Sequence, residues 1–402
     1  MSLLERPGAV LVAALVLFIV LCVAMPSGWH GNARISDVPV YERYGNAIER
    51  GSVPYRDFRP EYPSGALAAF ALPSLVSGSA VGYARAFGLE MALLGAACVV
   101  FAFLALRSLG ATGARLAAGV AVPAAAPLLL GPLVLTRFDL YPAALVVAAI
   151  AAFVAGRDRL GGGVLGAAIA VKLFPAVLVP VAVAWVWRRR GRREALVVLG
   201  ICAGVTAAIF LPFLVIAPDG VAWSLWRQLG RPLQIESFGA AILLALHQLG
   251  MPLGWSSSHG SQNLTGTAAT VASVLSSVAQ VGVLLWIWVR YARRAVVTPD
   301  AFVCACVASL VAFVALGKVI SPQFLIWLLA VVALVGARRT WPAVALLVLA
   351  CGLTRGWFPD RYWSLVFRFD PVASWLVLLR DLTLLALLAV LVRPGRERAR
   401  SS

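Results

Sequence analysis

The chain has 402 residues, of which 61% are hydrophobic and only 13% are charged, whereas soluble domains carry about 25% charged residues. Apolar stretches of about 18 residues or more recur along the whole length, which excludes a soluble protein and predicts an all-α polytopic membrane protein. No segment is long and polar enough for a separate soluble domain, so we expect residues 1–402 to form one integral membrane domain.

The net charge of +17 would suit a nucleic-acid-binding protein, but its placement argues against that partner. Many lysines and arginines stand in short clusters beside apolar segments, at residues 188–193, 290–294 and 393–400. This is the positive-inside pattern, which orients a membrane protein and requires no ligand. A patch that binds anionic lipids is compatible with the same residues. We therefore expect a lipid bilayer as partner and no nucleic acid.

The cysteines and histidines show none of the spacings that bind metals. The six cysteines lie in apolar runs without a CxxC pair, and the three histidines form no HExxH or similar pattern. We interpret the cysteines as packing residues and expect no disulfide, no metal and no other cofactor.

The first predicted membrane helix covers residues 9–26, with the N-terminus on the cytoplasmic side. A signal peptide is the alternative for residues 9–25. However, the preceding residues 1–8 carry one arginine and one glutamate, and the apolar run is longer than a usual signal-peptide core. We therefore expect an uncleaved first helix.

Helices are expected next at residues 84–106, 116–135 and 140–155, followed by an apolar segment at 160–187 with basic residues on both flanks. A single crossing would place one basic cluster outside, whereas two short helices that split near Lys172 keep both inside. Each short helix would have about 11–13 residues, or roughly 16–20 Å, which is too short for a full span. We therefore favour a hairpin buried against other helices.

The remaining full helices are expected at residues 194–216, 265–289, 300–317, 322–337, 340–353 and 372–393. The fold is then about twelve membrane segments, ten full helices plus the short hairpin, with both termini cytoplasmic. The outside loops are 27–80, 136–139, 218–263, 317–321 and 354–371, and residues 238–249 are expected along the membrane interface. Long loops with paired charges and aromatic residues often carry function, which favours loops 27–80 and 218–263.

The first outside loop contains a predicted helix over residues 38–50, preceded by Asp37 and ended by Gly51. Asp37 is suited to cap this helix. Because it lies near the outer membrane surface, it is also suited to act as a general base toward a hydroxyl. The two roles are compatible.

The second part of this loop, residues 54–63, holds three prolines and three aromatic rings in ten residues. Prolines favour a single path of the loop. Aromatic rings pack on the apolar faces of sugars, carboxylates accept hydroxyl protons, and arginine binds phosphate. The alternative is a rigid surface turn with weak exposed ion pairs.

Several motifs together resemble glycosyltransferase family 87. They are Asp37 shortly before VY, then YGNAIERGSVPYRDFRPEYP, RFDLYPAAL, the Lys172–Phe174–Pro175 group, RPLQIES and KVISPQF. The resemblance spans about residues 35–390 and is most specific in the first loop. It implies a C-type glycosyltransferase fold, a polyprenyl-phosphate sugar donor and an inverting reaction on the extracytoplasmic face of the plasma membrane. It also implies that Asp37 is the essential acid.

The characterised branch of this family consists of actinobacterial mannosyltransferases that build phosphatidylinositol mannosides. The resemblance therefore implies mannose as the donor sugar and a glycolipid or glycan as the acceptor, while arabinose and glucose stay open because a fold does not fix the substrate.

The residues are compatible with such chemistry. Inversion requires one base, and the departing lipid phosphate requires fixed positive charge. The candidates for the phosphate contact are Lys172, Lys318, Arg137 and Arg380. The candidates for binding the sugar or the acceptor are Tyr55, Arg59, Glu61, Gln234, Glu236 and Gln323. Each of these could instead brace a loop.

Three phosphate candidates have specific alternatives. Arg380 lies roughly 13 Å into its helix and should face the bundle interior; pairing with Asp381 is the alternative, but adjacent helix residues face each other poorly. Lys172 has no acid nearby in sequence, so its alternative is snorkelling to a headgroup. Arg137 could simply pair with Asp139 at a helix end.

Two other functions are alternatives to sugar transfer. A transporter or flippase of lipid-linked sugars would place polar residues on broken helices near the membrane midplane, often in two repeated halves. The short hairpin with Lys172 favours that function, but the sequence shows no two-half repeat. A scaffold subunit of an envelope complex would leave the charged first loop unexplained.

Overall fold

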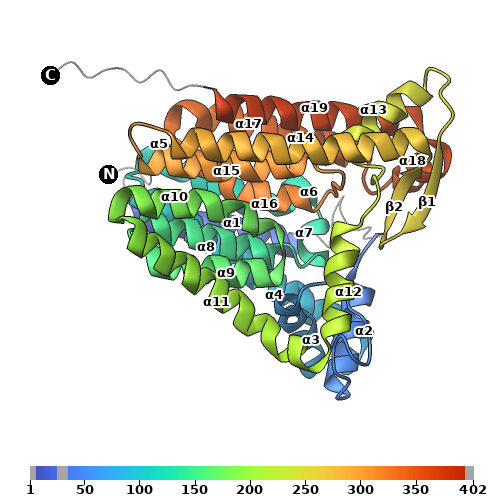
Figure 1. The fold of residues 1–402 in the computed structure, drawn as a ribbon, viewed down its shortest axis with the longest axis horizontal. Helices are drawn as coiled ribbons and strands as arrows, with labels where there is room; N and C mark the ends of the chain where they lie inside the picture. The colour runs from blue at the N-terminus through green and yellow to red at the C-terminus, as the bar shows by residue number, and fades with distance from the viewer. Residues whose placement is uncertain (1–5, 25–34, 394–402) are drawn as a thin grey trace.

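The chain folds into helices because backbone N–H and C=O groups must be paired in an apolar environment. The computed structural model describes residues 6–24 and 35–393, and Figure 1 shows its long helices running along a common axis as one bundle. Predictions that fall on residues 1–5, 25–34 and 394–402, including most of the basic tail, lie outside the described residues.

The described chain is almost entirely helical, and η marks short 3₁₀ helices. Its first half contains α1 (Pro7–Ala24), α2 (Val38–Glu49), η3 (Ser64–Ala66), α3 (Leu67–Leu75), α4 (Ala80–Ser108), α5 (Gly113–Ala124), α6 (Ala126–Leu130), α7 (Leu133–Thr136), α8 (Leu140–Val154), α9 (Asp158–Val171), η4 (Phe174–Leu178), α10 (Val179–Arg190) and α11 (Arg192–Ile216). Its second half contains α12 (Pro218–Leu229), α13 (Phe238–His247), strands β1 (Gly254–Ser258) and β2 (Ser261–Thr265), α14 (Thr267–Ala292), α15 (Pro299–Ala315), α16 (Phe324–Val331), η5 (Val332–Leu334), α17 (Ala337–Arg355), α18 (Tyr362–Arg368) and α19 (Pro371–Val392).

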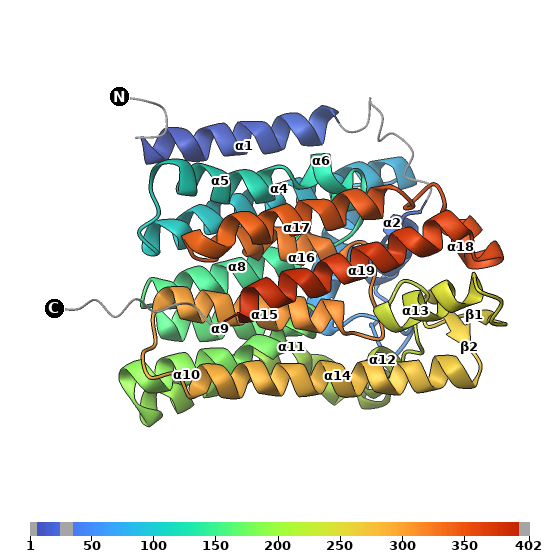
Figure 2. The same cartoon turned by 90° about the horizontal axis from the view of Figure 1, so that it is seen from above.

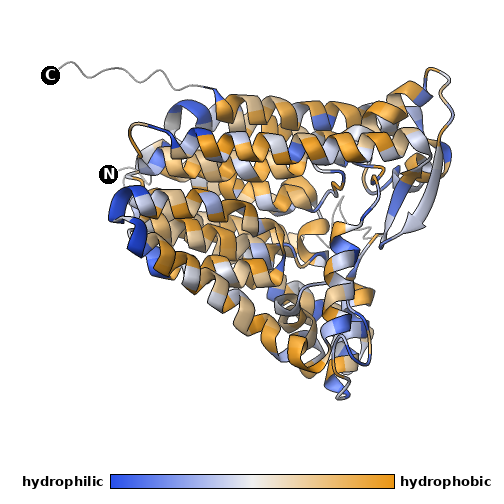
Figure 3. Ribbon diagram, in the orientation of Figure 1, coloured by the Kyte–Doolittle hydropathy of each residue, from blue (hydrophilic) through white to orange (hydrophobic). Residues whose placement is uncertain are grey.

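Five described helices are long and apolar enough to cross a membrane, namely α1, α4, α11, α14 and α19. Figure 3 shows apolar residues through the middle of the bundle and hydrophilic residues gathered toward its ends. Both observations support the predicted all-α membrane protein. Other apolar helices have 10–17 residues, so the number of membrane segments stays a prediction.

The two ends of the bundle differ in charge. Residues 188–193 and 290–294 lie at the same end, because Arg188 donates to the carbonyls of Ala292 and Ala295 at 3.0 and 3.2 Å. We call this the basic end. The opposite end, which we call the site end, carries α2, α12, α18 and the two strands (Figure 1). Figure 2 shows α1 at one edge of the bundle, beside α4 and α5.

The apolar segment at 160–187 forms a hairpin, as predicted. Lys172 is extended between α9 and η4, and the two outer ends of the hairpin meet at the basic end. Arg190 pairs with Asp158 at 2.6 Å and donates to the carbonyl of Gly156 at 2.9 Å. Because both basic flanks lie together, a single crossing by this segment is excluded.

The predicted single helix at 116–135 is wrong, because the chain breaks there into α5, α6 and α7. Pro127 begins α6, where its missing N–H disrupts no helical bond. Gly131 then adopts φ +64°, a conformation that favours glycine, and Pro132 follows it. These residues end each helix within a few turns although the segment is apolar throughout.

The two long outside loops contain more structure than the sequence analysis predicted. The helix after Asp37 is confirmed as α2, but α3 in the first loop was not foreseen. In the second loop, β1 and β2 pair antiparallel, and His259 and Gly260 between them have φ +54° and +64°. Positive φ at both central residues is typical of a tight two-residue hairpin turn. The helix α13 packs on α14 and α19.

Glycines allow α9 to approach α11 closely. A Cβ on Gly166 would lie 2.3 Å from the carbonyl oxygen of Cys202, and one on Gly162 would lie 2.9 Å from that of Val198. Neither backbone oxygen can move without displacing a helix. The neighbouring Gly163 has more room, since its nearest contact would be a side-chain atom at 3.6 Å.

We expect Gly166→Ala to destabilise the protein by about 1–3 kcal/mol, because the added methyl group overpacks the α9–α11 interface. Gly163→Ala is the matched control and should leave stability unchanged or slightly improved. The measurement is the thermal unfolding midpoint of each purified variant in detergent. Equal midpoints for the two variants would contradict the close packing of α9 on α11.

Candidate active site

Asp37 and Arg137 form an ion pair at the site end of the bundle. Asp37 precedes α2, and Arg137 lies between α7 and α8. The Asp37 side chain is 34% exposed, whereas that of Arg137 is 5% exposed. The predicted helix cap is wrong, because the Asp37 carboxylate accepts no backbone N–H of α2. Arg137 holds it instead, while the N–H of Val38 donates to Ser36 Oγ at 3.2 Å.

The buried Arg137 guanidinium has hydrogen-bonding capacity left. Its Nη2 donates to the carbonyl of Ile35 at 3.4 Å, but its buried Nε finds no hydrogen-bond acceptor among the described residues. Buried donors are usually satisfied, and an unsatisfied one calls for a specific explanation. An anion held next to Asp37 would supply the missing acceptor.

A second buried ion pair joins Asp139 to Lys172. The carboxylate of Asp139 is 1% exposed, and its Oδ1 accepts from Lys172 Nζ at 2.6 Å and from Trp327 Nε1 at 2.7 Å. Two interpretations of the sequence are therefore wrong. Lys172 does have an acidic partner, because its ammonium pairs with Asp139. Arg137 pairs with Asp37 and not with Asp139.

Aromatic residues connect the two ion pairs. The hydroxyl of Tyr41 lies 3.4 Å from Asp37 Oδ2, and its ring centroid lies 5.8 Å from that of Phe138. The ammonium of Lys172 lies 4.5 Å from the centre of the Phe138 ring and 4.9 Å from that of Trp327. Such contacts favour a cation where water is excluded. A chain of contacts through Tyr41 and Phe138 thus leads from the partly exposed Asp37 to the buried Lys172.

A third group of polar residues comes from the segment between α12 and α13. The backbone N–H of Gln234 donates to the carbonyl of Lys318 at 2.9 Å, which fixes this segment beside the start of α16. The Gln234 amide donates to Glu236 Oε2 at 2.5 Å and to Ser321 Oγ at 3.0 Å. Both side chains are almost fully buried, and Gln234 Oε1 has no partner in the described chain.

Arg380 holds this segment from α19. Its guanidinium is fully buried, donates to the backbone carbonyl of Glu236 at 2.6 Å and lies 2.5 Å from Asp381 Oδ1. The argument that adjacent helix residues face each other poorly is therefore wrong for this pair. The arginine side chain is long enough to fold back onto the neighbouring carboxylate in the buried site. Arg380 faces the bundle interior, as predicted, and positions Glu236.

The carboxyl group of Glu236 differs in its protonation from the paired carboxylates of Asp37 and Asp139. Burial raises the pKa of its carboxyl to about 8, although Arg380 and Arg137 oppose the increase. These cations are committed elsewhere, because Arg380 is paired with Asp381 and Arg137 with Asp37. Glu236 is therefore mostly protonated at neutral pH and adds little negative charge to the site.

Two candidates for sugar binding have structural roles in residues 54–63 of the first loop, which we call the wall. Tyr55 is buried with φ +70°, and its hydroxyl donates to the carbonyl of Tyr62 at 2.7 Å. Glu61 pairs with Arg227 of α12, and its backbone carbonyl accepts from Gln228. These contacts attach the wall to α12.

The remaining candidates lie around the margin of the site. Arg59 is exposed and stacks over Trp223 at 5.7 Å. Lys318 donates to the carbonyl of Leu229 at 3.2 Å, and Gln323 is half-buried just before α16. Among the described residues, none of these three side chains makes a hydrogen bond or an ion pair with Asp37, Asp139 or Glu236.

Sequence reasoning missed four residues of the site, namely Tyr41, Asp139, Arg231 and Trp327. Arg231 donates to the carbonyl of His259 at 2.8 Å and lies close enough to Lys172 and Glu236 to act on them electrostatically. Asp139 stood inside the RFDLYPAAL motif, and that position was the available signal. No signal in the sequence distinguished Trp327, because it is one of many apolar residues in α16.

We expect Asp139→Asn to destabilise the protein by about 3–5 kcal/mol, because it leaves the buried Lys172 ammonium without a counter-charge. Removing that charge as well, in Asp139→Asn/Lys172→Met, should recover part of the loss. The measurement is a double-mutant cycle of thermal unfolding in detergent that includes Lys172→Met. Strictly additive effects would contradict the ion pair.

The raised pKa of Glu236 predicts a pH-dependent stability. The folded protein retains the Glu236 proton up to about pH 8, whereas the unfolded chain releases it near about 4.3. The free energy of unfolding should therefore fall as pH rises between these values. Glu236→Gln, which stays neutral, should flatten this slope, whereas Glu49→Gln on the exposed side of α2 should not. Identical slopes in all three proteins, measured by thermal unfolding from pH 5 to 8, would exclude the protonated Glu236.

Comparison with known proteins identifies the family. The chain has no match among curated proteins. The family model described as "Glycosyltransferase family 87" matches residues 61–322, which include Arg137, Asp139, Lys172 and Glu236 but neither Asp37 nor Arg380. Because the match covers more than half of the 402 residues, the protein belongs to glycosyltransferase family 87 and is a membrane glycosyltransferase.

Proposed function

We propose that the protein transfers a sugar from a polyprenyl-phosphate donor to a hydroxyl group of an extracytoplasmic glycolipid or glycan, with inversion at the anomeric carbon. The observation that carries this proposal is the placement of a partly exposed carboxylate, Asp37, directly against a buried cation, Arg137. A base and an anion-binding group side by side are what transfer from a lipid phosphate requires.

Positive charge predominates in the site and favours a phosphate. Arg137, Lys172 and Arg231 are cationic, while Asp37 and Asp139 are their carboxylate neighbours. Glu236 adds little charge at neutral pH because burial raises its pKa to about 8. We propose that Arg137 contacts the donor phosphate through its unused Nε and that Lys172 contributes positive charge nearby. With that charge in place, the reaction proceeds without a metal.

Asp37 is the proposed base because, of the site acids Asp37, Asp139 and Glu236, it is the one that is both partly exposed and paired with a cation. Asp139 is 1% exposed, and its Oδ1 already accepts from two donors, so burial keeps it from an incoming hydroxyl. In the proposed step Asp37 takes the proton of the acceptor hydroxyl, whose oxygen attacks the anomeric carbon. The bond from that carbon to the phosphate oxygen breaks, and the lipid phosphate leaves with the electron pair.

The remaining features follow the family and the charge pattern. We propose mannose as the sugar, and the plasma membrane as the location, with the site end extracytoplasmic and the basic end cytoplasmic. Gln234 and Glu236 hold the segment between α12 and α13 in place beside the site. Lys318 and Gln323 at the margin of the site remain candidates for acceptor contacts. Membership of a glycosyltransferase family favours transfer over transport or a scaffold role.

We expect Asp37→Asn to lower transfer by at least about 100-fold while the protein stays folded. Asparagine keeps an oxygen for Arg137 but cannot accept the hydroxyl proton. The assay incubates membranes containing each variant with polyprenyl-phosphate mannose and a lipid extract, and mass spectrometry identifies the product. Size-exclusion chromatography reports whether each variant is folded.

The matched control is Asp57→Asn, since Asp57 lies in the same loop, where it pairs with the exposed Arg56 and accepts from the backbone N–H of Val53 at 2.7 Å. Asparagine keeps an oxygen for that N–H. This variant should transfer like the wild-type protein. Undiminished transfer by folded Asp37→Asn would remove Asp37 as the base. No product from wild-type membranes with mannose, arabinose and glucose donors alike would contradict the polyprenyl-phosphate donor.

A further inference from the structure

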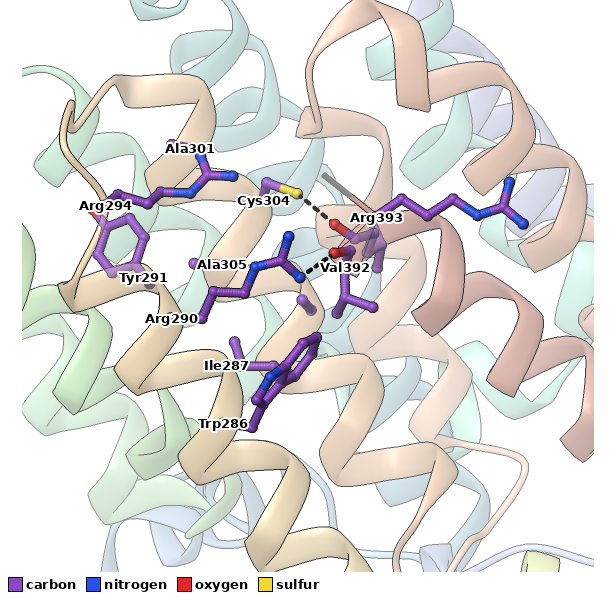
Figure 4. Close-up of a pocket in the computed structure, with 12 residues that line it drawn as sticks. Trp286, Ile287, Arg290, Tyr291, Arg294, Ala301, Cys304, Ala305, Val392 and Arg393 are labelled. Carbon is purple, nitrogen blue, oxygen red and sulfur yellow. Dashed lines mark hydrogen bonds between the residues drawn. The ribbon is translucent and has the colours of Figure 1, made fainter. Parts of the chain in front are cut away.

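A cleft opens at the basic end of the bundle, far along the helices from the candidate active site. It lies between the end of α14, the start of α15 and the end of α19 (Figure 4). Its lining includes Trp286, Arg290, Tyr291, Arg294 and Arg393. Figure 4 shows the guanidinium groups of Arg290 and Arg294 at the cleft, whereas the side chain of Arg393 extends away from it. No acidic residue lines the cleft within the described chain.

The three arginines are not neutralised by the protein around them. Arg290 donates to the carbonyl of Val392 at 2.6 Å, which fixes it at the end of α19. The side chains of Arg294 and Arg393 take part in no hydrogen bond or ion pair with any described residue. The acid at the start of α15, Asp300, pairs with Arg115 at 3.4 Å. An unpaired cationic cleft of this kind favours an anionic ligand.

The surface beside the cleft indicates that the ligand carries an acyl chain. Trp286 is 47% exposed, and the guanidinium of Arg290 lies 5.1 Å from its ring centre. Tryptophan and arginine together are typical of the membrane–water boundary. From there an exposed apolar stripe runs along α14 toward the middle of the bundle, through Leu285, Val281, Val278 and Val274. These residues recur at helical spacing and so lie on one face.

We propose that this cleft binds the phosphate headgroup of an anionic glycerophospholipid, with an acyl chain along the exposed face of α14. Arg290 and Arg294 contact the phosphate, and Trp286 packs at the level of the glycerol. The lipid thereby links α14, α15 and α19 at the basic end. This site is separate from the proposed transfer site and does not depend on it.

The test uses the full-length protein in detergent and native mass spectrometry. Phosphatidylglycerol, phosphatidylcholine with the same acyl chains, and soluble glycerol 3-phosphate are titrated separately. We expect wild-type protein to retain phosphatidylglycerol in preference to the other two ligands. Removing two cleft charges in Arg290→Gln/Arg294→Gln should weaken phosphatidylglycerol binding by about fivefold for each arginine.

The matched control is Arg107→Gln, because Arg107 is an exposed arginine in the last turn of α4 that does not line the cleft. This variant should bind phosphatidylglycerol like the wild-type protein. An equal loss in the control would overturn the proposal, since general surface charge would then explain the binding. Equal retention of phosphatidylcholine, or equally tight binding of glycerol 3-phosphate, would also overturn it. The wild-type comparison decides between these outcomes even if the double variant does not fold.

Discussion

The buried carboxylate of Asp139 is the group on which the arrangement of the site depends. It accepts from Lys172 at 2.6 Å and from Trp327 at 2.7 Å, and so joins the start of α8 to the turn of the α9–α10 hairpin and to α16. An unpaired ammonium at the turn of an apolar hairpin would be strongly unfavourable. The ion pair therefore permits this break in the hairpin and places Lys172 beside Phe138 and the candidate active site.

The three acids of the site have different roles because their surroundings differ. Asp139 is buried and accepts from two donors through Oδ1, whereas Asp37 is partly exposed and held by Arg137. Burial raises the pKa of Glu236 to about 8, and its nearest cations are committed to other acids. One carboxylate is thus left available for proton transfer while the site as a whole stays positive. That combination suits a reaction in which a hydroxyl loses a proton and a phosphate departs.

The two ends of the bundle separate two kinds of contact with anions. At the site end, buried cations are paired with acids, and the exposed carboxylate of Asp37 lies among them. At the basic end, Arg294 and Arg393 have no acidic partner among the described residues. The arrangement at the site end suits a phosphate that binds and leaves, because the paired acids limit the affinity of the cations for that phosphate. The arrangement at the basic end suits a lipid that is retained.

The sequence by itself determined the all-α membrane fold, the hairpin that splits near Lys172, helix α2 after Asp37 and the resemblance to the family, because apolar runs, flanking charges and short motifs are local. The run at 116–135 was predicted as one helix, although Pro127, Gly131 and Pro132 stand within it. Only the tertiary structure decided which charges pair. Asp139 meets Lys172 and Trp327 across 33 and 188 positions, and Asp37 turns from its helix to Arg137. Ion pairs form between groups that packing brings together, and separation along the chain does not limit them.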